Sequence, residues 1–119
     1  MSRAGRYRFG LWAELACRVD LRLRGYRICG VRARTPMGEI DIVARRGDVV
    51  AVIEVKARRD AVAAALALQG RQRARIVQAA RWLMGRRPEW VGAVVRFDVM
   101  LVTPWRRPRH LVNAWGDEA

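Results

Sequence analysis

Apolar residues between positions 11 and 24 recur every three or four places, whereas Arg18 and Arg22 take a polar face. This spacing predicts an amphipathic helix over residues 11–24. Gly25 follows directly, and glycine is the residue type at which helices most readily end. The chain is therefore expected to open on a helix that stops near Gly25.

One acidic residue interrupts an apolar stripe of this predicted helix. Successive members of this stripe, Leu11, Glu14, Cys17 and Leu21, are three or four places apart, and all but Glu14 are apolar. Charged side chains are rarely buried without a partner. The carboxylate of Glu14 is therefore expected either to point toward a functional site or to reach solvent at the edge of the stripe.

Short apolar runs after the helix predict strands separated by turns. Residues 26–33 indicate a first strand, and 36–38, with proline and glycine, indicate a turn. Residues 39–44 and 49–55 predict two further strands, joined by 46–48 with glycine where the chain reverses. The middle of the chain is therefore expected to form a β-hairpin.

The second half of the chain predicts one more helix between strands. The alanine-rich residues 58–70 indicate either a mobile loop or a weakly anchored helical turn. Residues 71–84 predict an amphipathic helix with a recurring apolar face, made of Ile76, Ala79, Ala80 and Leu83. Residues 91–102 and 110–114 predict the last two strands. Without repeats or linkers, residues 1–119 are expected to form a single α/β domain.

The predicted hairpin gathers acidic and basic side chains. Alternation along a strand places Glu39 and Asp41 on one face of the first strand and Glu54 and Lys56 on one face of the second. The opposite faces carry the apolar residues Ile40 and Ile42 in the first strand, and Ile53 and Val55 in the second. Hairpin strands lie about 4.8 Å apart, which brings Asp41 near Glu54 if the register aligns them. Two such carboxylates repel unless a proton or a cation separates them, and Mg²⁺ suits oxygen ligands of this kind.

A cation held there would supply part of a hydrolytic site. It would polarise a phosphate and lower the pKa of a bound water, while Lys56 positions that water or stabilises developing charge. The simpler interpretation is a surface Glu/Lys pair along a strand, since a pattern as short as Glu54-Val55-Lys56 recurs by chance. Glu39 is expected to pair with a neighbouring arginine and not to bind metal.

The net charge of +13 on 119 residues favours a polyanionic partner. Nucleic acid is favoured over an anionic membrane, ribosomal RNA or a general bias toward arginine. Lys56 is the single lysine of the chain. Because lysine offers a compact ammonium whose pKa burial can shift, this position is a candidate for chemistry that arginine cannot perform.

The two cysteines, Cys17 and Cys29, have neither zinc-site nor disulfide-scaffold spacing, which favours a reducing cytoplasm. The polar, basic start lacks the apolar segment of a signal peptide, and no run approaches the roughly 18 apolar residues that span a membrane. No membrane association is expected. His110, the single histidine, is expected to be a structural or surface residue.

The runs GEIDIVA (38–44) and VIEVKAR (52–58) closely resemble the YraN-like family of small bacterial proteins, uncharacterised protein family 0102. This family is similar to Holliday-junction resolvases within the PD-(D/E)xK, restriction-endonuclease-like superfamily. The likeness extends over nearly the whole chain, through Ala13-Glu14, Gln72, residues 96–99 and Asn113-Ala114. Ile40 stands where the superfamily often has proline.

The resemblance implies a restriction-endonuclease-like core: a mixed β-sheet flanked by helices in the order α-β-β-β-α-β. It implies that Asp41 and Glu54 bind Mg²⁺ or Mn²⁺, that the Val55 carbonyl is a further ligand, and that Lys56 is the catalytic lysine. Glu14 resembles the helix-borne acidic residue of resolvase-like members and is a further candidate ligand. Gln72 is a weaker candidate for a polar site residue.

Three functions are therefore considered. The first is a metal-dependent nuclease that cuts DNA, favoured over RNA, with branched or damaged DNA as the structured substrate; cutting a junction at two points would make a homodimer useful. The second is a non-catalytic nucleic-acid-binding or assembly module that retains the nuclease fold. The third is an interaction protein whose five tryptophans supply contact surface, although core packing is the commoner role of tryptophan.

Overall fold

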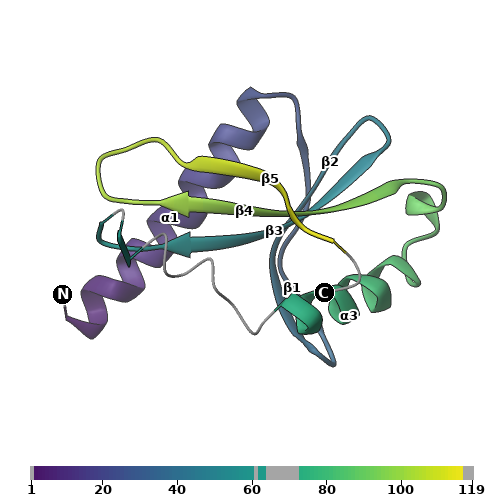
Figure 1. Cartoon of the computed structure of the whole chain (residues 1–119), viewed down its shortest axis with the longest axis horizontal. Coiled ribbons are helices and arrows are strands. Elements are labelled where there is room, and N and C mark those ends of the chain that lie inside the picture. The colour runs from purple at the N-terminus through teal and green to yellow at the C-terminus, as the bar shows by residue number, and fades with distance from the viewer. Residues whose placement is uncertain (1, 61, 64–72, 117–119) are drawn as a thin grey trace.

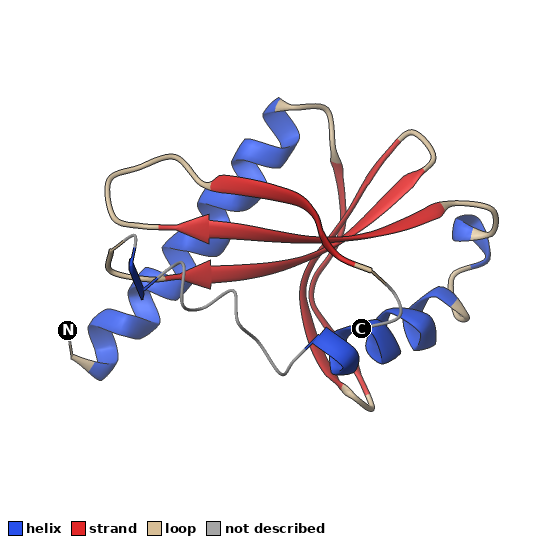
Figure 2. Ribbon diagram, in the orientation of Figure 1, coloured by secondary structure: helices blue, strands red, loops and turns tan. Residues whose placement is uncertain are grey.

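The computed structural model describes residues 2–60, 62–63 and 73–116 (Figure 1). Helices and strands follow the predicted order α-β-β-β-α-β, and the last strand predicted, over 110–114, is also present at the C-terminal end (Figure 2). The five strands form one mixed sheet in the order β1-β2-β3-β4-β5, antiparallel except for the parallel pair β3 and β4. The elements are α1 Arg3–Leu23, β1 Arg27–Thr35, β2 Gly38–Arg46, β3 Val49–Ala57, α3 Arg73–Met84, β4 Val94–Val102 and β5 Arg109–Trp115.

Helix α1 begins earlier than the apolar pattern predicted. Its first residue is Arg3, because the Ser2 side chain caps the helix by accepting a hydrogen bond from the Gly5 N–H at 2.9 Å. The predicted end is confirmed. Gly25 has φ +89°, a left-handed conformation that glycine adopts without steric cost.

The buried face of α1 is formed mainly by small side chains. Ala13, Cys17 and Leu21 are fully buried, so the stripe that carries Glu14 does face the sheet. The larger apolar residues at helical spacing face solvent instead, namely Leu11, Trp12, Leu15, Val19 and Leu23. Even so, no helix within the described part of the chain is long and apolar enough to span a membrane.

Each helix covers one face of the sheet and closes one hydrophobic core (Figure 1). On the α1 side, Cys17 and Leu21 pack with Ile42, Ile53 and Met100. On the other side, α3 buries its predicted face against sheet residues and two tryptophans, in a cluster that includes Ile76, Ala79, Ala80, Leu83, Trp90, Phe97 and Trp115. The predicted core of the second helix is thus confirmed.

The segments around α3 differ from prediction in detail. Strand β4 begins at Val94, later than predicted, because a short 3₁₀ helix, Pro88–Trp90, and a turn at Gly92 with φ +83° precede it. The start of the second helix at 71–72 and most of the alanine-rich segment lie outside the described residues. Within that segment, the Ala63 N–H donates to Asp60 Oδ1 at 2.8 Å, which indicates a local turn.

Candidate metal-dependent active site

Strands β2 and β3 separate at one point of the sheet and form a fork. Their pairing runs from Arg46↔Val49 to Ile42↔Ile53 and then stops. Beyond it, β2 continues beside β1, while β3 continues beside β4. Arg75 of α3 donates to the Glu39 carbonyl at 3.4 Å, which ties the departing strand to α3. The next two positions in register across the fork are those of Asp41 and Glu54.

The alternation of side chains along β2 breaks at Asp41. Ile40 and Ile42 were predicted to share a face, but this was wrong: Ile40 packs in the core on the α3 side, and Ile42 packs in the core on the α1 side. The strand turns about its axis where its pairing with β3 ends. This local turn places the carboxylate of Asp41 in the fork.

Asp41 and Val55 meet across the fork. Asp41 Oδ2 accepts a hydrogen bond from the Val55 N–H at 2.8 Å. In an extended strand, the N–H and C=O of one residue point to the same edge. The Val55 carbonyl is therefore directed toward β2 as well, so that a carboxylate oxygen and a peptide oxygen face the same gap.

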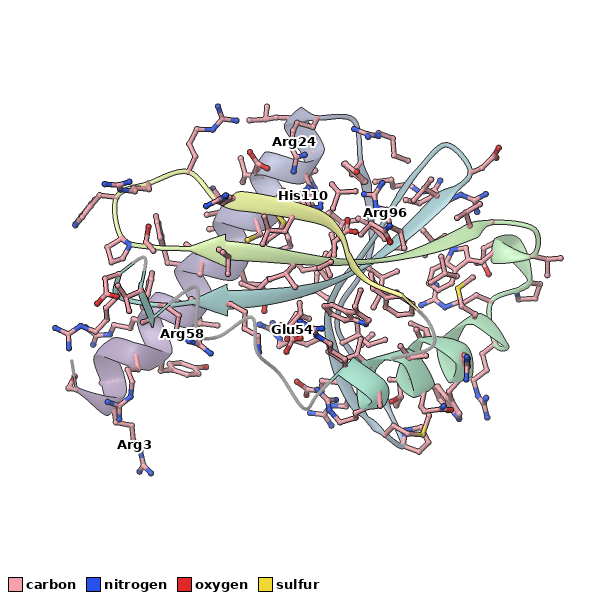
Figure 3. The ribbon with its side chains drawn as sticks, in the orientation of Figure 1. Arg3, Arg24, Glu54, Arg58, Arg96 and His110 are labelled. Carbon is pink, nitrogen blue, oxygen red and sulfur yellow. The ribbon has the colours of Figure 1, made fainter. Side chains whose placement is uncertain are left out.

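Glu54 and Lys56 occupy the β3 side of the fork. Lys56 Nζ lies 2.9 Å from Glu54 Oε1, as the shared face of a strand predicts, and their side chains are only 14% and 13% exposed. Figure 3 shows Glu54 close to where β3 passes in front of β1 and β2. A pair this sheltered differs from the solvated surface pair that was the simpler interpretation.

Glu14 reaches the same region from α1. Its side chain is 12% exposed, and its Oε1 accepts a hydrogen bond from Arg32 Nη1 at 2.9 Å. The burial of Ala13 and Cys17 on either side in sequence holds Glu14 toward the sheet. The carboxylate thus lies near Asp41 and is sheltered, and does not reach solvent at the edge of the stripe.

Arg32 is a residue of this region that the sequence pattern did not single out. The register of β1 and β2 places it opposite Asp41, between the pairs Val31↔Ile42 and Ala33↔Ile40. Its φ of +49° lies in the left-handed region, which is uncommon for a residue with a side chain. This conformation coincides with the break at Asp41 and with the ion pair to Glu14.

The pKa of Asp41 is raised above its ordinary value. Burial is the largest cause, and the negative charges of Glu54 and Glu14 add to it. The Val55 N–H and the Lys56 ammonium act in the opposite direction without cancelling the shift. All four candidate side chains therefore interact electrostatically at the fork.

The donor chemistry of the fork fits a hard divalent cation. Asp41, Glu54 and the Val55 carbonyl offer oxygen atoms, which Mg²⁺ and Mn²⁺ prefer. Among the residues described, no three Asp, Glu, His or Cys side chains are already arranged as a metal cluster. Mg²⁺ does not need one, because it often binds through one or two carboxylates with water and substrate phosphate as the other ligands.

A hollow of about 560 Å³ lies between α1 and the fork. Acidic, basic and apolar side chains from α1 and three strands line it: Arg6, Tyr7, Gly10, Leu11, Glu14, Arg32, Asp41, Val55 and Ala57. Two acidic residues, Glu14 of α1 and Asp41 of β2, and two arginines, Arg6 and Arg32, are therefore among its lining residues. An anionic group that enters this hollow meets both arginines.

Two further polar residues named from the sequence, Gln72 and Glu39, are not assigned to the fork. Gln72 lies outside the described residues, so its side chain is not located. Glu39 of β2 pairs with Arg34 of β1 at 3.7 Å at the exposed end of these two strands, which confirms the expected ion pair with a neighbouring arginine. Such an exposed pair contributes little to stability.

A second polar network lies away from the fork, between β4, β5 and the end of α1. Asp98 is fully buried and accepts hydrogen bonds from Arg96, from His110 Nε2 at 2.7 Å and from the Asn113 N–H. Arg24 donates to His110 Nδ1, so that the ring proton on Nε2 is the one shared with Asp98. Figure 3 shows Arg24, His110 and Arg96 gathered beside β5. The structural role expected of His110 is thus confirmed.

Comparison with known sequences identifies the family. A family model described as Uncharacterised protein family UPF0102 matches residues 13–102, which include the fork, Glu14 and Asp98. The chain belongs to this family. The UPF0102 protein of Parvibaculum lavamentivorans is 52% identical over 109 residues, which cover 92% of this chain and 82% of that protein. The UPF0102 protein of Nitrobacter winogradskyi is 48% identical over 114 residues, which cover 95% and 96%.

The UPF0102 membership predicted from residues 38–44 and 52–58 is thereby confirmed. The matched residues cover most of both relatives named above, so the comparison concerns one common unit. The likeness to Holliday-junction resolvases stays a prediction.

Replacing Asp41 by asparagine tests the electrostatics of the fork. Asp41→Asn is expected to raise the Tm of the metal-free protein at pH 8, because it removes a buried negative charge while the amide oxygen still accepts the Val55 N–H. A gain of about 1 kcal/mol corresponds to about 3–6 °C in a domain of this size. A carboxyl whose pKa is raised on folding, such as that of Asp41, stabilises the wild type at low pH, and this stabilisation is lost as pH rises. The difference in Tm between Asp41→Asn and the wild type should therefore be smaller at pH 5 than at pH 8.

The measurement is thermal melting at both pH values, with and without millimolar Mn²⁺. Mn²⁺ should raise the Tm of the wild type by binding the folded state, and should raise that of Asp41→Asn much less. Glu39→Gln, an exposed carboxylate of the same strand, is the matched control and should behave like the wild type in both respects. An equal metal-induced shift in wild type and Asp41→Asn would contradict the ligand assignment.

Proposed function

We propose that this protein is a Mg²⁺- or Mn²⁺-dependent nuclease that hydrolyses phosphodiester bonds in DNA. The observation that carries the proposal is the convergence at one fork of Asp41, Glu54, Lys56 and the Val55 carbonyl, with Glu14 supplied by α1. The net charge of +13 supports a polyanionic substrate, held largely through its phosphates. The two free cysteines support a place in the reducing cytoplasm.

The residues of the fork have two proposed roles: some bind the cation, and Lys56 acts on the phosphate and the attacking water. Asp41, Glu54 and the Val55 carbonyl would hold the cation, which when bound polarises the phosphate and acidifies a water molecule. Lys56 is kept in place by Glu54 and presents a positive charge to the negative charge that develops on the phosphate. Its three N–H donors can also orient the attacking water.

Arg32 and Glu14 form the outer part of the proposed site. In the structure described here they neutralise one another at 2.9 Å. If Glu14 turns to the cation or to its water, the guanidinium of Arg32 becomes available for a substrate phosphate, to which arginine binds with two parallel hydrogen bonds. The proposed role of Arg32 is therefore to position the phosphate.

The proposal is tested by cleavage of nicked, flapped, four-way and plain duplex DNA in Mn²⁺. Wild type should cut at least one of these substrates, and EDTA should stop the reaction. Asp41→Asn and Lys56→Ala should reduce the single-turnover rate by about 10²-fold or more, while Glu39→Gln should cut like the wild type. Cleavage that persists unchanged in both site variants would refute the site assignment.

A non-catalytic nucleic-acid-binding module is the second candidate. It is favoured by the ion pairs Glu54–Lys56 and Glu14–Arg32, which already neutralise two of the three carboxylates without a metal. This candidate predicts that wild type and Asp41→Asn bind the same DNA with equal affinity and that neither cuts any of the four substrates. Binding and cleavage measured on the same DNA therefore separate the two functions.

A further inference from the structure

Two of the five tryptophans lie at the surface, away from both cores. Trp90 and Trp115 are buried and Trp82 packs against the same core, as core packing predicted. Trp12 is 42% exposed on α1, and Trp105, in the loop between β4 and β5, is 96% exposed. An aromatic ring left so fully in water marks a candidate binding surface.

The two exposed tryptophans line one cleft. The N-terminal half of α1 forms one wall with Arg8, Phe9 and Trp12, and the β4–β5 loop forms the other with Pro104 and Trp105. The cleft has a volume of about 300 Å³, at the small end of ligand pockets. Phe9 and Trp12 stack with their ring centres 5.9 Å apart, so the α1 wall of the cleft is already an aromatic platform.

The surroundings of this cleft are basic. Arg8 belongs to the cleft itself, and Arg106 follows Trp105 directly and is exposed, whereas the exposed Arg107 pairs with Asp20 at 3.2 Å. Aromatic rings surrounded by guanidinium groups suit a ligand with flat π faces and a negative backbone. A second copy of this chain is less suited, because pairing the same face would bring its arginines together.

The cleft is continuous with the proposed active site along α1. Phe9 also lines a neighbouring hollow that contains Arg58 and Arg59, and this hollow shares Arg6 and Gly10 with the one that contains Asp41. Figure 1 shows the β4–β5 loop, the end of β3 and the N-terminal half of α1 at the same end of the molecule. A bound strand could therefore run from the fork to the tryptophans over a basic surface.

The backbone of Trp105 supports a specific role for its ring. Its φ of +64° lies in the left-handed region, which costs a residue with a side chain roughly 1–2 kcal/mol. The large apolar ring gains no burial in return, since it faces solvent. This conformation belongs to the turn of residues 103–106, in which the Arg106 N–H donates to the Thr103 carbonyl at 3.4 Å, and the turn holds the ring out in solvent, where a ligand can stack on it.

We propose that Trp12 and Trp105 form a stacking site for an unpaired base of a single-stranded nucleic-acid segment. The inference rests on the proposed function and specifies its substrate: DNA with an unpaired stretch beside the bond at the fork. A flapped or branched DNA contains such a stretch, and a blunt duplex does not. Stacking tolerates any base, so the site is expected to recognise strand state and not sequence.

The inference is tested by equilibrium binding of a fluorescent single-stranded oligonucleotide in EDTA, where no cleavage occurs. Trp12→Ala and Trp105→Ala should each weaken binding by about 5- to 100-fold, the range for loss of one stacked base. Trp105→Phe should restore most of the affinity, because it returns an aromatic face. Leu23→Ala, an exposed apolar residue of the same helix outside the cleft, should leave binding unchanged.

Three outcomes would overturn the inference. The first is that both alanine variants bind the oligonucleotide as the wild type does, or that an abasic oligonucleotide of the same length binds equally well. The second is that the variants lose binding to anionic vesicles and keep binding to DNA. The third is that the cleft proves to be a dimer contact, with Trp105→Ala abolishing a wild-type dimer and leaving oligonucleotide affinity unchanged.

Failure of the inference differs from failure of the proposed function. If the oligonucleotide result holds but no substrate is cut in Mn²⁺, the stacking site stands and the nuclease proposal fails. If DNA is cut in an Asp41-dependent manner while both tryptophan variants bind normally, the nuclease proposal stands and the stacking site is refuted.

Discussion

Lys56→Arg is expected to slow single-turnover DNA cleavage by about 10²- to 10³-fold, although it conserves the positive charge. The Lys56 side chain is only 14% exposed, and its ammonium lies 2.9 Å from Glu54 Oε1. A guanidinium is wider, planar and fixed in its donor directions, so it cannot occupy the position of a compact ammonium without displacing Glu54 or Asp41. The site therefore depends on the shape of this cation as well as on its charge.

The matched control is Arg34→Lys, a charge-conserving exchange at an exposed position that pairs with Glu39. It should cut DNA at the wild-type rate. In EDTA, Lys56→Arg should bind the same DNA as tightly as the wild type, because phosphate attraction depends on the unchanged net charge. Cleavage by Lys56→Arg within about twofold of the wild-type rate would contradict the proposed role.

The hairpin and the helix stop are the parts of the fold that the sequence predicted best. Gly47 and Gly25 have φ of +59° and +89°, which are local requirements that a single residue type reveals. The exposure of Leu11, Leu15 and Leu23 on α1 could not be predicted in this way. Periodicity shows that a helix has an apolar side, but which side meets the sheet depends on long-range packing of small residues such as Cys17.

The sequence was enough to name residues of the candidate site, but it did not predict how these residues are arranged. Pairing Asp41 with Glu54 required only the hairpin register, which holds as far as Ile42↔Ile53. The break in alternation at Asp41 and the left-handed Arg32 opposite it arise where two strands separate, and no local pattern signals that point. Nothing in the sequence distinguishes Arg32 from the many other arginines, whereas Lys56 is distinguished as the single lysine.

Asp98→Asn is expected to destabilise the fold by about 3–5 kcal/mol, the usual result of removing one partner from a buried ionic network. Asp98 is fully buried and accepts hydrogen bonds from Arg96, His110 and Asn113. An amide of the same size would leave the Arg96 charge without its counterion and would turn an N–H donor toward donors. Thermal melting should show a loss of more than about 10 °C in Tm.

The stability that Asp98 contributes is expected to depend on pH. Burial opposes the ionisation of Asp98, but the hydrogen bonds from His110, Arg96 and the Asn113 N–H outweigh it and lower its pKa. A depressed carboxyl pKa contributes stability above the unfolded-state value of about 4, and that contribution is lost as pH falls toward the folded value. The Tm difference between wild type and Asp98→Asn should therefore be full at pH 7 and shrink below about pH 4.

Asp48→Asn, at an exposed position of the β2–β3 turn, is the control that changes the same charge outside the network. Its Tm should stay within about 1–2 °C of the wild-type value, since surface substitutions cost little. If Asp98→Asn melted like Asp48→Asn, the network would not stabilise the fold. The polar cluster that joins β4, β5 and α1 would then have to be explained by a functional role. Burying four ionisable side chains together, those of Arg24, Arg96, Asp98 and His110, would bring no gain in stability.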